Sequence, residues 1–142
     1  MAQKGMLTLT GKQRDESGEE TVVESRMPAD YYEKDGASYI LCQELHEDTG
    51  ETVKNVIKYR DSMLEMTRRG SFRSRMVFEP GRTHRTDYVT PFGTLSLETS
   101  TRKAEFVRLD NLIRIRLEYT LASESRFLSD CTLDLCLSFP EA

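Results

Sequence analysis

Apolar and polar side chains alternate along much of this chain, and two segments show the pattern plainly. In IRIRLEYTL (113–121), one face would carry Ile113, Ile115, Leu117, Tyr119 and Leu121. In CTLDLCLSF (131–139), one face would carry Cys131, Leu133, Leu135, Leu137 and Phe139. Successive side chains of a strand point to opposite faces, so each segment is predicted to be a strand with one buried and one wetter face.

Turn signals separate short runs of Val, Ile, Leu, Thr, Tyr and Phe about every ten residues, a spacing typical of an all-β sandwich or barrel. The signals are Ser17-Gly18, Asp35-Gly36, Asp48-Thr49-Gly50, Arg60-Asp61, Arg69-Gly70, Pro80-Gly81, Pro91-Phe92-Gly93, Asp110-Asn111 and the stretch 122–126. We therefore predict one domain over residues 1–142, an antiparallel meander of about 8–10 strands closed into a β-barrel, because closure removes exposed edges. The stretch PADYYEK (28–34) fits either one helical turn or an irregular strand.

The proline–glycine turn at 80–82 predicts a register for the strands around it. A two-residue loop here would be a type II turn, whose twist splays hairpin strands, so a three-residue loop is favoured. That loop places Phe78 opposite His84 on the inner face. It also places Arg75 opposite Asp87 on the outer face.

The next turn, at 91–92, extends the same register by one strand. It pairs Tyr88 with Leu95 on the inner face, and Arg85 with Glu98 on the outer face. Exposed pairs of opposite charge stabilise a sheet by only about 0.2–1 kcal/mol each. Cross-strand pairing with acidic residues could therefore account for Arg75 and Arg85 without any role in binding.

Charge is spread unevenly along the 142 residues, whose net charge is −4. Residues 1–53 carry 5 basic and 12 acidic residues, whereas residues 54–116 carry 14 basic and 7 acidic ones. Two interpretations follow: cross-strand neutralisation, which is the default in a closed sheet, or an anion-binding outer face. That face would consist of Arg73, Arg75, Arg82, Arg85, Arg102, Lys103, Arg114 and Arg116. Nucleic acid is the disfavoured partner, because the net charge is negative, acids are interleaved with the arginines, and no aromatic stacking motif of the RNP type is present.

The hydrophobic runs and the cysteines of the sequence bear on the cellular compartment of the protein. No apolar run approaches the roughly 20 residues of a membrane-spanning helix, and MAQKGMLTLTGK lacks the apolar core of a signal peptide. We expect a cytoplasmic protein with no membrane partner. Cys42, Cys131 and Cys136 form no C-x-x-C pair, so buried structural thiols are favoured over a zinc or redox site.

Catalytic motifs are absent from the sequence. G-x-S-x-G, the phosphate-binding G-x-x-x-x-G-K-S/T loop, G-x-G-x-x-G and H-E-x-x-H do not occur. His46 falls in an expected turn, and its spacing from Cys42 does not suggest a nucleophile–base pair. We predict no catalytic residue, no metal and no cofactor, and lean against an enzyme. Haem held by His84 is an analogy at the level of the fold alone.

A barrel of this size can enclose one small ligand. The candidate site is a partly apolar wall with a few polar groups, formed by His84, Tyr88, Met76, Phe78 and Tyr119. Tyr39 and Met66 are further residues expected to point inward. The competing interpretation is that these side chains fill the interior and leave no room for a ligand. The sequence locates no protein interface, so self-association stays open.

The segment MVFEPGRTHRTDYVTPFG (76–93) also carries a family pattern: M-x-F-x-x-G, then an aromatic residue, then T-P-x-G. It resembles the YwiB-like family of small bacterial proteins, and the similarity extends through MLTLTGKQ, YYEKDGASYILCQE, TRRGSFRS, LETSTRKAEF and IRIRLEYTL. The resemblance implies a lipocalin-like (calycin) barrel. It implies no activity, because the family is a domain of unknown function, and it carries over no functional residue. The charged segment 15–20 departs from the pattern and is expected to lengthen the first hairpin.

Overall fold

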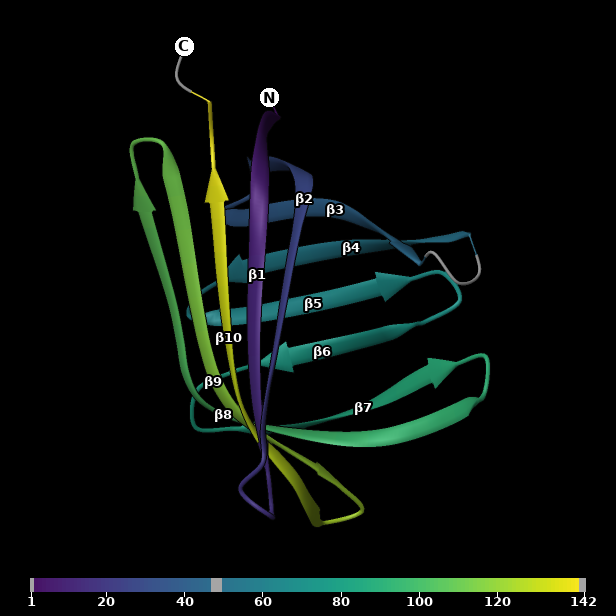
Figure 1. Ribbon diagram of the computed structural model, residues 1–142. Helices are drawn as coiled ribbons and strands as arrows, with labels where there is room; N and C mark the ends of the chain where they lie inside the picture. Colours follow the sequence, from purple (N-terminus) through teal and green to yellow (C-terminus); the bar gives the residue numbers. More distant parts are fainter. Residues whose placement is uncertain (1, 47–49, 141–142) are drawn as a thin grey trace.

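The alternating segments form strands, as the sequence predicts. The computed structural model describes residues 2–46 and 50–140, and within them it contains ten strands and no helix (Figure 1). The strands are β1 (Gln3–Asp15), β2 (Glu20–Lys34), β3 (Ala37–His46), β4 (Glu51–Arg60), β5 (Met63–Arg69), β6 (Ser74–Phe78), β7 (Thr83–Thr90), β8 (Gly93–Leu109), β9 (Leu112–Ser123) and β10 (Arg126–Ser138). That part of the chain offers no helix able to cross a membrane.

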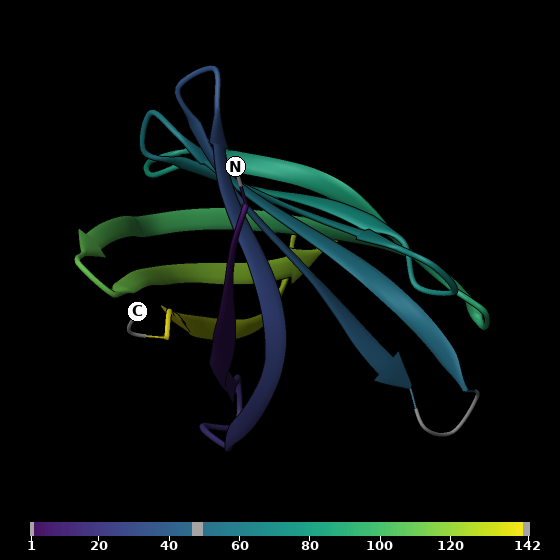
Figure 2. The same ribbon diagram turned by 90° about the horizontal axis from the view of Figure 1, so that it is seen from above.

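One antiparallel sheet contains all ten strands in the order β6-β5-β4-β3-β2-β1-β10-β9-β8-β7. The sheet wraps into a nearly closed barrel flattened into two layers, whose strands cross rather than run side by side (Figures 1 and 2). β1, β9 and β10 form one layer, and β3 to β7 form the other. The long β8 belongs to both layers and has a register shift between Thr101 and Lys103, and such an irregularity lets a strand bend.

The barrel is closed at the seam between β6 and β7, the two ends of the sheet. Arg73 and Val89 exchange two backbone hydrogen bonds of 2.9 and 2.8 Å. Their pairing has the register predicted from the 80–82 loop. Along the rest of the seam, the Thr86 hydroxyl donates to the Arg75 carbonyl oxygen at 2.7 Å. Side-chain contacts therefore replace part of the ladder that the sequence predicts here.

Apolar side chains fill the centre of the barrel. The strand faces predicted for β9 and β10 are confirmed, and Ile113, Leu117 and Leu137 are at most 1% exposed. Aromatic pairs join the two layers. The Tyr59 ring stacks on Phe106, with ring centroids 4.7 Å apart.

The structure decides between the two alternatives for residues 28–34 of β2 and corrects one prediction about β3. PADYYEK lies inside β2 and is strand throughout, so a helical turn is wrong there. Tyr39 points outward, since Ile40 beside it in the chain is buried against the core. The Tyr39 ring stacks on Tyr32, with centroids 4.9 Å apart, and the Lys58 ammonium lies 5.7 Å from the Tyr39 centroid.

The predicted turns lie between the strands, with one exception. The turn expected at 48–50 falls largely on residues 47–49, which are outside the described chain. The 15–20 segment forms the end of the β1–β2 hairpin, as expected. There the Asp15 carboxylate accepts hydrogen bonds from the amides of Ser17 and Glu19, both at 3.0 Å. The hydrogen bond that the Ser17 hydroxyl donates to the same carboxylate, followed by these amide bonds, holds the pKa of Asp15 below its usual value.

Candidate functional site

A row of polar side chains crosses the inner face of β3 to β7. We call it the inner polar row, and it comprises Glu44, Asn55, Arg68, Ser74 and Tyr88. The sheet register pairs Asn55 with Arg68, and Arg68 with Ser74. Tyr88 follows across the seam, opposite Ser74 in the register of the Arg73–Val89 bridge. Four adjacent strands thus bring Asn55, Arg68, Ser74 and Tyr88 to one level of the barrel. Glu44 on β3 lies one inward position farther along, opposite Val53.

Arg68 is the centre of this row. Its Nη2 donates to Glu44 Oε2 at 2.9 Å, and its Nη1 donates to the Tyr88 hydroxyl at 2.9 Å. The second carboxylate oxygen of Glu44 accepts a 2.9 Å hydrogen bond from the Asn55 amide. Charge and hydrogen bonding therefore fix the orientation of all four side chains.

Burial makes this arrangement costly. The Arg68 and Glu44 side chains are only 21% and 29% exposed, and Asn55 is 5% exposed. Ions that leave water lose solvation, and their mutual attraction repays this only when geometry is good and the remaining hydrogen-bonding groups are satisfied. Stability alone is thus a weak reason to place an arginine–glutamate pair on the inner face.

Several buried polar atoms of this region have no hydrogen-bond partner among the described residues. They are Arg68 Nε, Ser71 Oγ and Ser74 Oγ. Leaving a buried donor or acceptor unpaired costs about 1–3 kcal/mol, and nearly all such groups in proteins have a partner in protein or solvent. A bound molecule that offers hydrogen-bonding groups would satisfy them.

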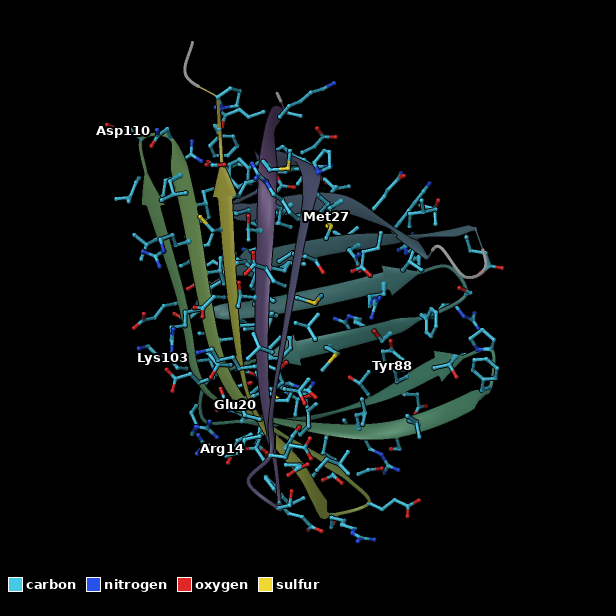
Figure 3. The ribbon with its side chains drawn as sticks, viewed as in Figure 1. Arg14, Glu20, Met27, Tyr88, Lys103 and Asp110 are labelled. Carbon is cyan, nitrogen blue, oxygen red and sulfur yellow. The ribbon has the colours of Figure 1, made fainter. Side chains whose placement is uncertain are left out.

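The inner polar row lies beside an apolar one. Met66 and Met76 are register partners one step farther along their strands, and both are partly buried against the core. The Phe72 ring lies 6.4 Å from the Tyr88 ring between centroids. Figure 3 shows Tyr88 on the part of the back layer that extends past β1 and β2 in that view. The site therefore combines apolar walls with polar groups near an end of the strands.

Two of the five predicted ligand-binding residues lie in the packed core instead. Phe78 is 1% and Tyr119 is 9% exposed, and their rings meet edge to face with centroids 4.7 Å apart. Burial raises the pKa of the Tyr119 phenol, so it stays protonated. These two rings pack together and close the interior beneath any ligand.

His84 lies on the same face of β7 as Tyr88, as predicted, but its polar contact is with the loop that follows β6. Its Nε2 is 2.9 Å from the Glu79 carboxylate, and its side chain is 32% exposed. His84 therefore has a hydrogen-bond partner, and it is more exposed than the core residues. Tyr88 and Met76 are the predicted site residues that lie with the inner polar row.

The outer arginines mostly have acidic neighbours. Arg116 contacts Asp134 at 3.1 Å, and Arg102 contacts Asp130 at 3.4 Å. Arg75 pairs at 3.0 Å with Glu65 of β5. Its expected partner, Asp87, is on the other side of the seam. The predicted register of Arg85 with Glu98 is confirmed, but Arg85 Nε donates to Ser96 Oγ at 2.9 Å.

Of the other predicted members of this outer face, Lys103 lies 3.2 Å from the Glu105 carboxylate. The remaining three, Arg73, Arg82 and Arg114, are exposed. Arg82 lies 3.6 Å from the Glu79 carboxylate. Arg114 Cα lies opposite Cys136 of β10 and Val107 of β8. Most of these cations therefore fit the cross-strand neutralisation that the sequence favours.

The cysteines are free thiols, and Cys42 and Cys131 are buried as expected. Burial, followed by the nearby Glu44 carboxylate, raises the pKa of Cys42 to about 11. A thiol that stays protonated at neutral pH is a poor nucleophile. The side chain of His46, the possible partner weighed for Cys42, lies outside the described residues. Over the described chain, no group of three or more His, Cys, Asp or Glu residues is placed to hold a metal ion.

The sequence analysis missed Arg68, Glu44 and Asn55, although the alternation contains the signal. Leu64 and Met66 point inward, so period two places Arg68 inward as well. In the same way, Asn55 lies between the buried Val53 and Ile57. Polar residues at the inward positions of a predicted strand are thus the sequence signal that indicates this site.

Comparison with known proteins agrees with this architecture. The crystal structure of the YwiB protein from Bacillus subtilis superimposes with a TM-score of 0.87 and 22% sequence identity, covering 99% of this chain and 94% of that one. At this identity the similarity shows the fold. No curated protein matches the chain. A family model described as "Domain of unknown function (DUF1934)" matches residues 7–135. The chain therefore belongs to the DUF1934 family, in agreement with the YwiB-like motifs of its sequence.

Proposed function

We propose that this barrel binds a small, neutral, partly apolar molecule at the inner polar row. The observation that carries the proposal is the set of buried, unpartnered atoms, Arg68 Nε and Ser74 Oγ, on neighbouring strands. The apolar body of the ligand would rest against Met66 and Met76. A carbonyl or hydroxyl group of the ligand would accept a hydrogen bond from Arg68.

Charge balance favours a neutral ligand. Glu44 already neutralises Arg68 through a 2.9 Å contact, so an anion at the same place would meet the carboxylate as well as the guanidinium. The sequence left open an anionic ligand on the outer arginines, and most of those arginines have acidic neighbours. The family resemblance implies a lipocalin-like barrel, and a meander barrel of this kind has room for an interior ligand.

Nile red is a suitable probe, because it is neutral, largely apolar and carries a carbonyl oxygen, and its fluorescence rises in apolar surroundings. We expect saturable binding to the wild-type chain. Ser74→Ala removes a buried hydroxyl that has no hydrogen-bond partner in the described part of the chain. The variant should therefore be as stable as the wild type or more so, while its affinity for the probe falls several-fold.

Ser129→Ala is the matched control, since Ser129 is also 7% exposed but lies near Cys131 Sγ, at 3.3 Å. It should bind Nile red as the wild type does and lose some stability. The absence of saturable binding would favour a filled interior and contradict the proposal. The proposal would also fail if Ser74→Ala lost stability and bound normally, because the hydroxyl would then have a structural role.

A further inference from the structure

A hollow lies on the outer face of the sheet, across β1 to β5. Its volume is about 740 Å³, within the 300–1,000 Å³ range typical of sites for small molecules. The outward-facing residues of its lining include Lys4, Asp30, Leu41, Lys54, Val56 and Arg69. Lys54 precedes Asn55 on β4, and Arg69 follows Arg68 on β5. Because successive side chains of a strand point to opposite faces, Lys54 and Arg69 lie on the face opposite the inner polar row.

Lys54 and Arg69 are a like-charge pair. They are direct register partners on β4 and β5, and both side chains are exposed. Within residues 2–46 and 50–140, neither has an acidic group at ion-pair distance. Like charges directly opposite each other destabilise an antiparallel sheet, whereas an anion placed between them would remove the repulsion. This pair is therefore poised to receive an anion.

The other edge of the hollow adds a third cation. Lys4 on β1 is opposite Asp30 on β2, and Asp30 is the acidic residue of the described lining. One carboxylate against three cations leaves the hollow positively charged, although the chain has a net charge of −4. The outer cations of β8 and β9, by contrast, mostly have acidic neighbours.

The floor between these cations is apolar. Leu41 and Val56 are register partners on β3 and β4, and each is partly buried on the outer face. Pro28 of β2 extends this surface. A ligand held here would place its charged group at Lys54 and Arg69 and an apolar body over Leu41 and Val56.

We infer that this outer hollow binds a small anion with an apolar body, either an organic phosphate or an organic carboxylate. The proposal is independent of the inner site, because the two sites use different residues on opposite faces and ligands of different charge. Lys54 and Arg69 would hold the anionic group by charge-assisted hydrogen bonds, which Arg can make in pairs to either kind of oxyanion.

The test is an NMR titration of the ¹⁵N-labelled full chain with phenyl phosphate, octanoate and inorganic phosphate, each used separately. Saturable shifts should concentrate on the amides of residues 41–43 and 54–56. Either organic anion binding at least tenfold more tightly than inorganic phosphate would support the proposal, and the tighter of the two would identify the charged group. If all three anions fail to give saturable shifts at these amides, or inorganic phosphate binds as tightly as both organic anions, the inference is overturned.

Two double variants separate a local site from net charge. Lys54→Gln/Arg69→Gln removes the opposed pair, whereas Arg73→Gln/Arg126→Gln removes two exposed cations away from the hollow. Each lowers the net charge from −4 by two, to −6. The first should weaken phenyl phosphate or octanoate binding at least tenfold, and the second by less than twofold. Equal losses in both would contradict a local site. Because all four side chains are exposed, both variants should fold, and the dispersion of their NMR spectra checks this.

Discussion

Two regions of the inner face differ in what their side chains can accomplish. On β1, β9 and β10 most inward residues are apolar, and Leu7, Leu117 and Leu137 have no exposed surface. Toward one end of β3 to β7 the inward residues are Glu44 and Arg68, which keep partial contact with solvent. The interior thus has a packed half, which centres on β1, β9 and β10 and continues onto Ile57 and Leu64 of the other layer. Its polar half, at one end of β3 to β7, carries charges and hydrogen-bonding groups.

This difference separates stability from binding. Burial of aliphatic side chains stabilises the fold at about 25 cal/mol per Å² of apolar surface. A half-buried ion pair with nearby unpartnered polar atoms contributes little or nothing net. The packed half therefore stabilises the barrel. The need for stability does not explain why the polar half contains charged and polar residues.

The largest effect is expected in the packed half. Leu117→Ala should lower the free energy of unfolding by about 2–5 kcal/mol, because it removes buried methyl groups and leaves a cavity. Urea denaturation followed by circular dichroism measures this loss. A loss below about 1 kcal/mol would show that the interior near Leu117 is loosely packed, and the contrast between the two halves would disappear.

A glycine sharpens the comparison at the junction of β1 and β10. A Cβ added at Gly5 would lie 2.5 Å from the Ser138 carbonyl oxygen, whereas at Gly11 the nearest atom would be 3.8 Å away. Gly5→Ala should cost about 1–3 kcal/mol through overpacking. Gly11→Ala is the matched control and should be far milder. Equal urea midpoints for the two variants would contradict the close approach of these strands.

Two arginines compare the inner polar row with the outer face. Arg68→Met removes the 2.9 Å ion pair that Arg68 makes with the partly buried Glu44 carboxylate, and we expect a loss of about 1–3 kcal/mol. Arg116→Met breaks an exposed pair and should cost less than about 1 kcal/mol. The double variant Glu44→Met/Arg68→Met should recover most of the loss, since no unpaired ion then remains. Additive losses in this cycle would show that the pair is not coupled.

Alkaline pH tests the burial of Cys42. Its pKa is raised from 9.0 to about 11 in the folded chain, so above pH 9 the unfolded chain releases this proton more readily. Stability from this group is therefore complete below pH 9 and is lost between pH 9 and pH 11, with about 1 kcal/mol gone at pH 10. Cys131 and Tyr31 shift in the same direction, so Cys42→Ala isolates one contribution. The stability gap between wild type and variant should narrow from pH 7 to pH 10, and a constant gap would contradict the raised pKa.

Much of the fold could be predicted, because its signals are local. Alternation identifies the buried faces of β9 and β10, and the 80–82 loop gives the register at Arg73 and Val89. The contact between β6 and β7 is harder to predict, because it joins the two ends of the sheet. In the described residues it consists of the Arg73–Val89 bridge and side-chain contacts, and Arg75 forms its ion pair with Glu65 rather than with Asp87. Tyr39 was predicted to point inward, but its neighbour Ile40 takes the inner position.

The candidate site was harder to predict than the fold. The sequence analysis looked for apolar walls and histidines, and it identified Tyr88 and Met76. Arg68 and Glu44 are 24 residues apart, and their contact depends on three strands lying in register. Side-chain packing decides whether a buried polar atom has a hydrogen-bond partner. The alternation of apolar and polar residues along a strand carries no information about that packing.

Native mass spectrometry of the freshly purified chain tests the central claim most directly. The account predicts that the wild-type chain carries an excess mass that vanishes on denaturation, and that Ser74→Ala carries much less of it. Bare chain mass in both proteins, in a sample that also fails to take up Nile red, would contradict a ligand at the inner polar row.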